Sequence, residues 1–130
     1  MIGVDTNILL RFLVDDDPEQ SRLAREFFAA CTPERPAYIC SVTLAETVWV
    51  LNRSLGYPGD IVLEMISRLL ASQEAIVEHG DSLGQILQEL GSGDIADFLI
   101  AFSNRQAGCT STITFDEKAA KTVPGMELIA

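Results

Sequence analysis

Basic residues are scarce in this sequence. Its 130 residues include nine Lys and Arg but nineteen Asp and Glu, which gives a formal net charge of −10 and a pI near 4.3. Proteins that bind nucleic acids usually present a basic surface. Taken alone, the charge argues against a nucleic-acid partner, so the conclusion depends on where the acidic residues lie.

Histidine and cysteine are also scarce. There is one His, and the three cysteines, Cys31, Cys40 and Cys109, lie far apart without a CxxC pair. This spacing argues against a zinc site. We expect the cysteines to be buried free thiols in a reducing cytoplasm.

Long hydrophobic runs are absent. No apolar run approaches the ~18 residues that a membrane span requires, and the first residues lack the basic segment of a signal peptide. The composition, with 48% hydrophobic and 22% charged residues, is close to that of a globular protein. We therefore expect a cytoplasmic protein with a single domain that spans residues 1–130.

The hydrophobic pattern predicts short strands that alternate with helices. We expect strands at residues 1–4, 37–40, 75–77, 109–115 and 127–129, and helices at residues 6–14, 18–30, 41–55, 60–71, 81–90, 94–107 and 116–121. This alternation is typical of an α/β fold, in which a parallel sheet of about five strands is sandwiched between helices.

Local signals predict where these helices begin and end. Four residues occupy positions typical of helix N-caps: Asp17, Ser41, Asp60 and Asp81. We expect helices to end at Gly56, at Gly91-Ser92-Gly93 and at Gly108. For the apolar helix faces, we expect Leu23, Phe27 and Ala30 to share one face and most of Trp49, Leu51, Leu69 and Leu70 to lie in the core.

The negative charge is unevenly distributed along the chain. Residues 60–100 hold eight acids and a single base, Arg68, whereas residues 101–130 hold three of each. For four of these acids, simple exposure to solvent is as good an explanation as a specific role. They are Glu64, Glu74, Glu78 and Glu89.

Other carboxylates occupy positions at the carboxyl ends of the predicted strands, where open parallel sheets bind ligands. Asp5 ends the first strand, Glu46 lies in the helix after the second strand, and Asp116 follows the strand at 109–115. Asp94 and Asp97 begin a long helix and share one of its faces. Asp5, Asp94 and Asp116 could also serve as helix caps, but Glu46 and Asp97 lie on largely apolar faces where a carboxylate needs another reason.

Carboxylates that converge in this way repel one another unless a cation lies between them. A site with only oxygen ligands favours Mg²⁺ or Mn²⁺ over zinc. Such an ion can activate water and neutralise the charge that develops on a phosphate, so the pattern predicts hydrolysis of phosphodiester bonds.

Four segments resemble the acidic motifs of PIN-domain nucleases, in the same order and with similar spacing. They are Val4-Asp5-Thr6-Asn7, Ser41-Val42-Thr43-Leu44-Ala45-Glu46, Ala96-Asp97-Phe98-Leu99-Ile100-Ala101 and Thr114-Phe115-Asp116. The resemblance covers essentially the whole chain. A PIN domain of this length is similar to a VapC-type toxin, the ribonuclease half of a toxin–antitoxin pair.

The resemblance implies roles for individual residues. Asp5, Glu46, Asp97 and Asp116 would be catalytic acids that bind Mg²⁺ or Mn²⁺ in an endoribonuclease. Behind them, Asn7, Asp94 and Thr114 would support these ligands through hydrogen bonds. The resemblance also implies a homodimer and a small antitoxin protein, which typically places a peptide, often with an Arg, in the acidic pocket.

The resemblance leaves RNA contacts weakly defined, because few bases lie near the acids. The candidates are Arg11, Arg53, Arg105 and Lys118, and Arg53 is expected on the helix face that carries Glu46. A PIN fold that only binds a partner, and a solitary RNA-processing nuclease without an antitoxin, are the alternatives.

Two other families fit the sequence less well. A haloacid-dehalogenase-type phosphatase needs a second Asp two residues after the first, where this chain has Asn7. A response-regulator receiver domain needs an acid pair after its first strand, but Asp15-Asp16-Asp17 follow a predicted helix.

Overall fold

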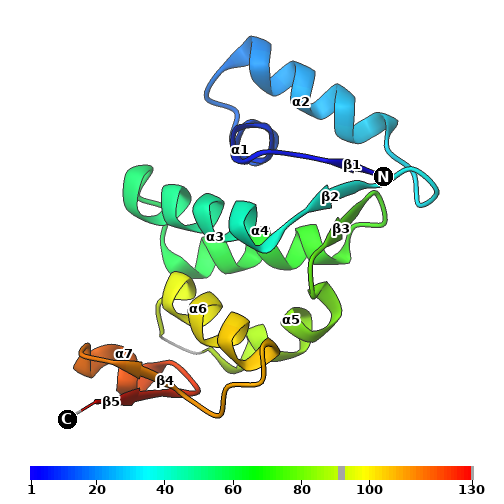
Figure 1. The fold of residues 1–130 in the computed structure, drawn as a ribbon. Coiled ribbons are helices and arrows are strands. Elements are labelled where there is room, and N and C mark those ends of the chain that lie inside the picture. The colour runs from blue at the N-terminus through cyan, green and yellow to red at the C-terminus, as the bar shows by residue number, and fades with distance from the viewer. Residues whose placement is uncertain (91–92, 130) are drawn as a thin grey trace. The chain divides into compact units, whose positions relative to one another are not determined.

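The computed structural model describes residues 1–90 and 93–129. The chain divides into two compact units, Met1–Asp81 and Ser82–Ala130, and each contains parallel strands. Figure 1 shows the elements of both units in chain order by colour.

A three-stranded parallel sheet forms the centre of the first unit. Its strands are β1 (Ile2–Gly3), β2 (Ala37–Ile39) and β3 (Ala75–Val77), with β2 in the middle. Backbone hydrogen bonds extend the pairing past the strands, from Val4 to Tyr38 and from Glu78 to Ile39. All three strands therefore end at one edge, where Asp5, Cys40 and Glu78 follow them.

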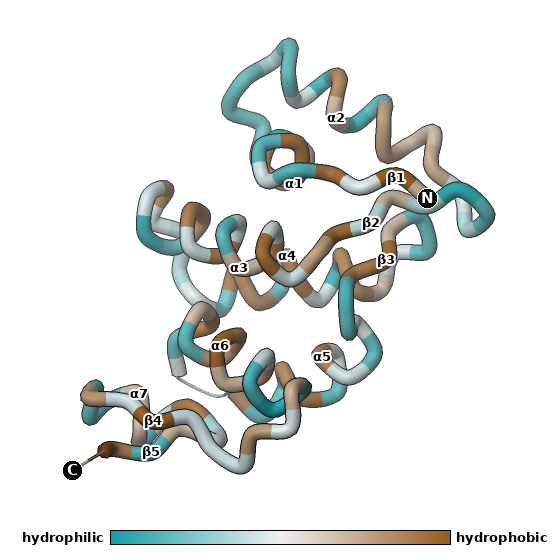
Figure 2. Tube along the Cα trace, in the orientation of Figure 1, coloured by the Kyte–Doolittle hydropathy of each residue, from teal (hydrophilic) through white to brown (hydrophobic). Residues whose placement is uncertain are grey.

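Four helices connect these strands. They are α1 (Thr6–Leu13), α2 (Pro18–Ala30), α3 (Ser41–Trp49) and α4 (Gly59–Ala71), and a π-helical turn, Val50–Ser54, extends α3. α1 packs against α2 and α3, and α4 packs against β3. Figure 2 shows hydrophobic residues along β1 and a hydrophilic turn between α1 and α2.

The second unit contains a two-stranded parallel sheet, formed by β4 (Thr112–Thr114) and β5 (Met126–Leu128). Its helices are α5 (Gly80–Ile86), which begins just before the unit boundary, α6 (Ile95–Gln106) and α7 (Glu117–Thr122). A 3₁₀ turn, Leu87–Glu89, follows α5. The side chain of Asn104 on α6 donates a hydrogen bond to Thr112 Oγ1 on β4, at 3.0 Å.

These elements confirm the predicted α/β class and all five predicted strands, each paired in parallel. The difference lies in the grouping, because the strands form sheets of three and two within the described residues, whereas one sheet of five was expected. The strands are only two or three residues long, so each ladder rests on few hydrogen bonds.

The predicted N-caps have mixed outcomes. Asp17 caps α2 as expected and accepts a hydrogen bond from the Gln20 N–H, with Pro18 in the first turn. The prediction that Asp60 and Asp81 are N-caps was wrong, because each lies inside the first turn of its helix. Ser41 was also wrong as a cap, since α3 begins at Ser41 itself.

Two of the predicted helix ends have left-handed glycines, since Gly56 has a φ of 75° and Gly108 a φ of 99°. In the predicted Gly91-Ser92-Gly93 turn, residues 91 and 92 lie outside the described residues. The backbone at Gly93 is crowded, because a Cβ there would come within 2.8 Å of the Thr122 carbonyl oxygen.

Leu23 and Phe27 share one face of α2 as expected, but the buried face of the helix lies about one position further along. The helix buries Ser21, Ala24 and Phe28, while Leu23 is 51% exposed. Phe28 stacks on Phe12 of α1 with ring centroids 4.1 Å apart, and this contact fixes the rotation of the helix.

The core interpretation of Leu51 and Leu69 is confirmed, since both are buried. For Trp49 this interpretation was wrong, because its side chain is 53% exposed. The expected burial of the cysteines is confirmed for Cys31, but it was wrong for Cys40, which is partly exposed, and for Cys109, which is exposed. Among the described residues, no helix combines the length and apolar character needed to cross a membrane.

We predict that Leu9→Ala lowers the free energy of unfolding by about 2–5 kcal/mol, because Leu9 is fully buried and its truncation leaves a cavity. The matched variant Leu23→Ala removes the same atoms from an exposed position and should change stability by no more than about 0.5 kcal/mol. Urea denaturation of both variants measures this difference. Equal losses would contradict the observed rotation of α2.

Candidate functional site

Asp5 lies at the carboxyl end of β1 and is the N-cap of α1. Its Oδ1 accepts a hydrogen bond from the Ile8 N–H at 3.2 Å, and its side chain is exposed. The cap occupies one carboxylate oxygen, and Oδ2 forms no hydrogen bond or ion pair with the described residues. Asp5 can therefore cap the helix and still offer an oxygen to a ligand.

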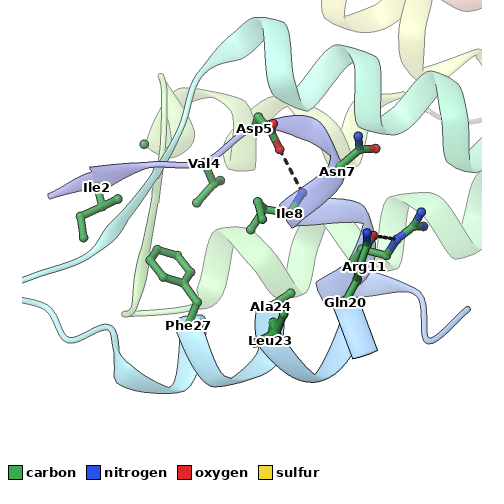
Figure 3. Close-up of a pocket in the computed structure, with 11 residues that line it drawn as sticks. Ile2, Val4, Asp5, Asn7, Ile8, Arg11, Gln20, Leu23, Ala24 and Phe27 are labelled. Atoms are coloured by element: carbon green, nitrogen blue, oxygen red, sulfur yellow. Dashed lines mark hydrogen bonds between the residues drawn. The ribbon is translucent and has the colours of Figure 1, made fainter. Parts of the chain in front are cut away.

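A groove of about 650 Å³ opens beside Asp5, between β1, α1 and α2. Figure 3 shows Leu23 and Phe27 of α2 on one side of it, with Ile2 of β1 and Val4, just after this strand, opposite. Asn7, two residues after Asp5, also lines the groove. The groove is thus largely apolar, with polar groups next to the first acid.

Glu46 projects from the outer face of α3. The opposite face of this helix is buried through Thr43, Leu44, Thr47 and Val48. Glu46 is exposed, and its neighbours one turn away on the same face, Val42 and Trp49, are 78% and 53% exposed. Glu46 therefore has apolar neighbours, as predicted, but these neighbours are exposed on the surface of this unit.

Glu78 has a role that the sequence did not indicate. It follows β3, and its Oε1 accepts a hydrogen bond from the Ser41 N–H at the start of α3, at 2.9 Å. This hydrogen bond lowers the pKa of Glu78, and partial burial opposes the shift. A usable signal existed, because Glu78 follows its strand as directly as Asp5 follows β1.

Asp94 and Asp97 occupy the first turn of α6. Asp94 is the N-cap, and its Oδ1 accepts a hydrogen bond from the Asp97 N–H at 3.0 Å. Both side chains are partly exposed. The sequence allowed Asp94 to be either a ligand or an N-cap, and the N-cap role is observed. By accepting this hydrogen bond, Asp94 fixes the backbone that carries Asp97.

Asp116 and Thr114 form a similar local arrangement after β4. Asp116 is the N-cap of α7 and accepts a hydrogen bond from the Ala119 N–H at 3.0 Å. The Asp116 N–H donates to Thr114 Oγ1, also at 3.0 Å. Thr114 therefore holds the turn that presents Asp116 to solvent.

The predicted quartet divides between the two units. Asp5 and Glu46 belong to the first unit, where Asp5 caps the helix after β1 and Glu46 lies in the helix after the neighbouring strand β2. Asp97 and Asp116 belong to the second unit, at the starts of α6 and α7. Within either unit, the described residues bring together no group of three or more His, Cys, Asp or Glu side chains.

The four candidate RNA contacts lie in different environments. Arg11 is engaged, because it pairs with Asp16 at 3.0 Å and donates to Gln20 at 2.8 Å. Arg53 lies in the π-helical turn, whose wider winding rotates it away from the face predicted for an unbroken α-helix. Arg105 and Lys118 are exposed and form no ion pair with the described residues.

We predict that Asp94→Ala destabilises the protein by about 1 kcal/mol, because the Asp97 N–H loses its acceptor at the start of α6. Asp94→Asn should retain most of this stability, since Asn is an equally good N-cap. Thermal and urea unfolding of the two variants test the prediction. If Asp94→Asn were as damaging as Asp94→Ala, the charge of Asp94 would have a role beyond capping.

Comparisons with known proteins give one match. Neither the curated proteins nor the solved structures contain a match to this chain. The family model of the PIN domain matches residues 2–123, a range that includes elements of both units and all four acids of the predicted quartet. The chain therefore belongs to the PIN domain family.

Proposed function

We propose that this chain is an endoribonuclease that requires Mg²⁺ or Mn²⁺, with Asp5, Glu46, Asp97 and Asp116 as its metal-binding acids. PIN domains are generally nucleases that use divalent metals. All four acids fall within the matched range, residues 2–123. We further propose that the whole chain, residues 1–130, acts as one domain.

The electrostatic state of these acids is the observation that carries the proposal. In the first unit, four arginines pair with acids outside the quartet; these pairs are Arg11–Asp16, Arg22–Glu19 and Glu26, Arg25–Asp15 and Arg68–Glu64. Asp5, Glu46 and Asp116 form no ion pair with the described residues. Asp5, Glu46 and Asp116 thus remain available to a cation.

The donor chemistry fits a hard divalent cation. Asp5 and Asp116 each use one oxygen in a helix cap, which leaves Oδ2 for a ligand, and Glu46 offers both oxygens. The set contains no sulfur and no imidazole, which favours Mg²⁺ or Mn²⁺ over zinc. When bound, such an ion lowers the pKa of water and neutralises charge on the phosphate.

The remaining residues orient these groups. Asn7 presents an amide beside Asp5 that can hydrogen-bond to a water molecule or a phosphate oxygen. Asp94 and Thr114 hold the backbone N–H groups of Asp97 and Asp116. Arg105 and Lys118 are the best-placed phosphate contacts, because both are exposed and unpaired within the described residues, whereas Arg11 is engaged with Asp16.

We predict that Glu46→Gln and Asp97→Asn each reduce Mn²⁺-dependent cleavage of single-stranded RNA by roughly 100-fold or more. Each change removes a charge at nearly constant volume, and the loss of several kcal/mol of charge stabilisation corresponds to that factor. EDTA should abolish the activity of the wild-type protein. Cleavage of a labelled RNA by the purified proteins measures these effects.

A matched control is Glu34→Gln, which makes the same chemical change at an exposed loop position and should retain full activity. Trp49 is the sole tryptophan and is 53% exposed three residues after Glu46, so its fluorescence can report RNA binding by the inactive variants. Full nuclease activity of either Glu46→Gln or Asp97→Asn would overturn the metal assignment.

We also propose that the protein is a VapC-like cytoplasmic toxin, a homodimer that a small antitoxin protein inhibits. The groove beside Asp5 supports an antitoxin, because an apolar peptide can fill it while a basic residue approaches the carboxylate. Asp5, Glu46 and Asp116 favour a basic partner in the same way.

If this proposal holds, induced expression of the wild-type chain should arrest bacterial growth, because RNA cleavage stops translation. The viable count should fall to a tenth or less of that of an uninduced culture. Expression of Glu46→Gln should not arrest growth, and the proposal requires that a small protein encoded next to the gene restores growth when it is co-expressed. Growth arrest of equal strength by Glu46→Gln would contradict a nuclease toxin. No arrest by the wild type, with RNA cleavage in vitro, would instead favour an RNA-processing nuclease.

A further inference from the structure

Helix α3, which carries Glu46, begins without a local side-chain cap. Its N-cap residue is Cys40, whose side chain forms no capping hydrogen bond. The first N–H groups of any helix lack partners within the helix and need acceptors from elsewhere. Cys40 Sγ contacts the Thr43 hydroxyl at 3.4 Å, so the thiol serves the first turn, but the N–H of Ser41, the first residue of α3, needs an acceptor from outside the helix.

Glu78 supplies that acceptor from the next strand. Its Oε1 lies 2.9 Å from the Ser41 nitrogen, while its own N–H donates to the Ile39 carbonyl oxygen, also at 2.9 Å. Glu78 is thus bound through its backbone to the end of β2 and through its side chain to the start of α3. These two hydrogen bonds bracket Cys40, the residue between β2 and α3.

The surroundings of Glu78 favour its charged form. The negative charge lies at the helix N-terminus, where the backbone dipoles stabilise an anion. His79 Nε2 lies 3.7 Å from Glu78 Oε2. Tyr38 and Cys40 lie close enough for the charge of Glu78 to act on them, so the carboxylate is surrounded by groups of β2, β3 and α3.

We propose that Glu78 is a positioning residue that fixes the orientation of α3 and, through it, the direction in which Glu46 points. The inference rests on the proposed function of Glu46 as a metal ligand. α3 is a nine-residue helix that continues at its C-terminal end into a π-helical turn. At its N-terminal end, the hydrogen bond from the Ser41 N–H to the Glu78 side chain links the helix to the residue that follows β3. Glu46 lies in the second turn after this hydrogen bond.

The test compares four single variants and one double variant with the wild type, all checked for folding by circular dichroism. Glu78→Ala removes the acceptor, Glu78→Gln keeps an oxygen at the same place, and Ser41→Pro removes the donor. Proline suits this position, because it is the first helical residue and Cys40 has an extended backbone with φ −76° and ψ 163°. Glu74→Ala is the matched control, since Glu74 precedes the same strand and accepts a hydrogen bond from Ser72 at 2.6 Å.

Two measurements are needed, and the first does not involve metal. Hydrogen exchange of the amides in the first turn of α3 should become faster in Glu78→Ala, but not in Glu78→Gln or Glu74→Ala. In the second, Mn²⁺ affinity measured by calorimetry should fall by about tenfold in Glu78→Ala, a typical effect of residues that orient metal ligands. Glu78→Gln should restore most of the affinity.

The double variant Ser41→Pro/Glu78→Ala provides the most specific readout. If Glu78 acts through the Ser41 N–H, the double variant should bind Mn²⁺ no more weakly than Glu78→Ala alone, because both changes break one interaction. Additive losses would overturn the inference, as would an unchanged Mn²⁺ affinity in Glu78→Ala. Failure of the wild type itself to bind Mn²⁺ would overturn the proposed function and this inference with it.

Discussion

The parallel register of β1, β2 and β3 is the constraint on which the first unit depends. Because the three strands run in one direction and end together, the residues that follow them share one edge of the sheet. Asp5 and Glu78 thereby lie on either side of the β2–α3 junction, and each accepts a backbone N–H at the start of a helix. Sheet register thus determines where the carboxylates lie, and the carboxylates determine where α1 and α3 begin.

Helix N-termini explain how the chain accommodates these carboxylates. Asp5, Asp94 and Asp116 are N-caps, and Asp97 lies in the first turn of α6, so each carboxylate interacts with backbone dipoles that favour a negative charge. Capping and metal binding need not compete, because a cap occupies one carboxylate oxygen and a ligand can use the other. A structural role as a helix cap therefore does not prevent Asp5 or Asp116 from also binding a ligand.

The sequence predicted much of what depends on local chemistry, although the N-caps expected at Ser41, Asp60 and Asp81 were wrong. Strand and helix positions, the Asp17 cap and the acids at the strand ends followed from hydrophobic periodicity and capping preferences. Other features that it missed depend on tertiary contacts: stacking of Phe12 on Phe28 rotates α2 by one residue, and the hydrogen bond from Ser41 to Glu78 links residues 37 positions apart. The exposure of Trp49 belongs to the same class, because a helical pattern shows which residues share a face but not whether another element covers it.

The excess of negative charge acquires a different meaning once ion pairs are considered. The arginines at 11, 22, 25 and 68 cancel acids outside the quartet, so they contribute little positive potential to any nearby ligand. An RNA phosphate that approaches Asp5 or Glu46 is repelled unless a cation intervenes. If the proposed function holds, RNA binding therefore requires metal binding. The ion that would take part in the chemistry would also supply the positive charge that a basic surface supplies in other RNA-binding proteins. Affinity for RNA should accordingly depend more on the divalent ion than on the few exposed bases.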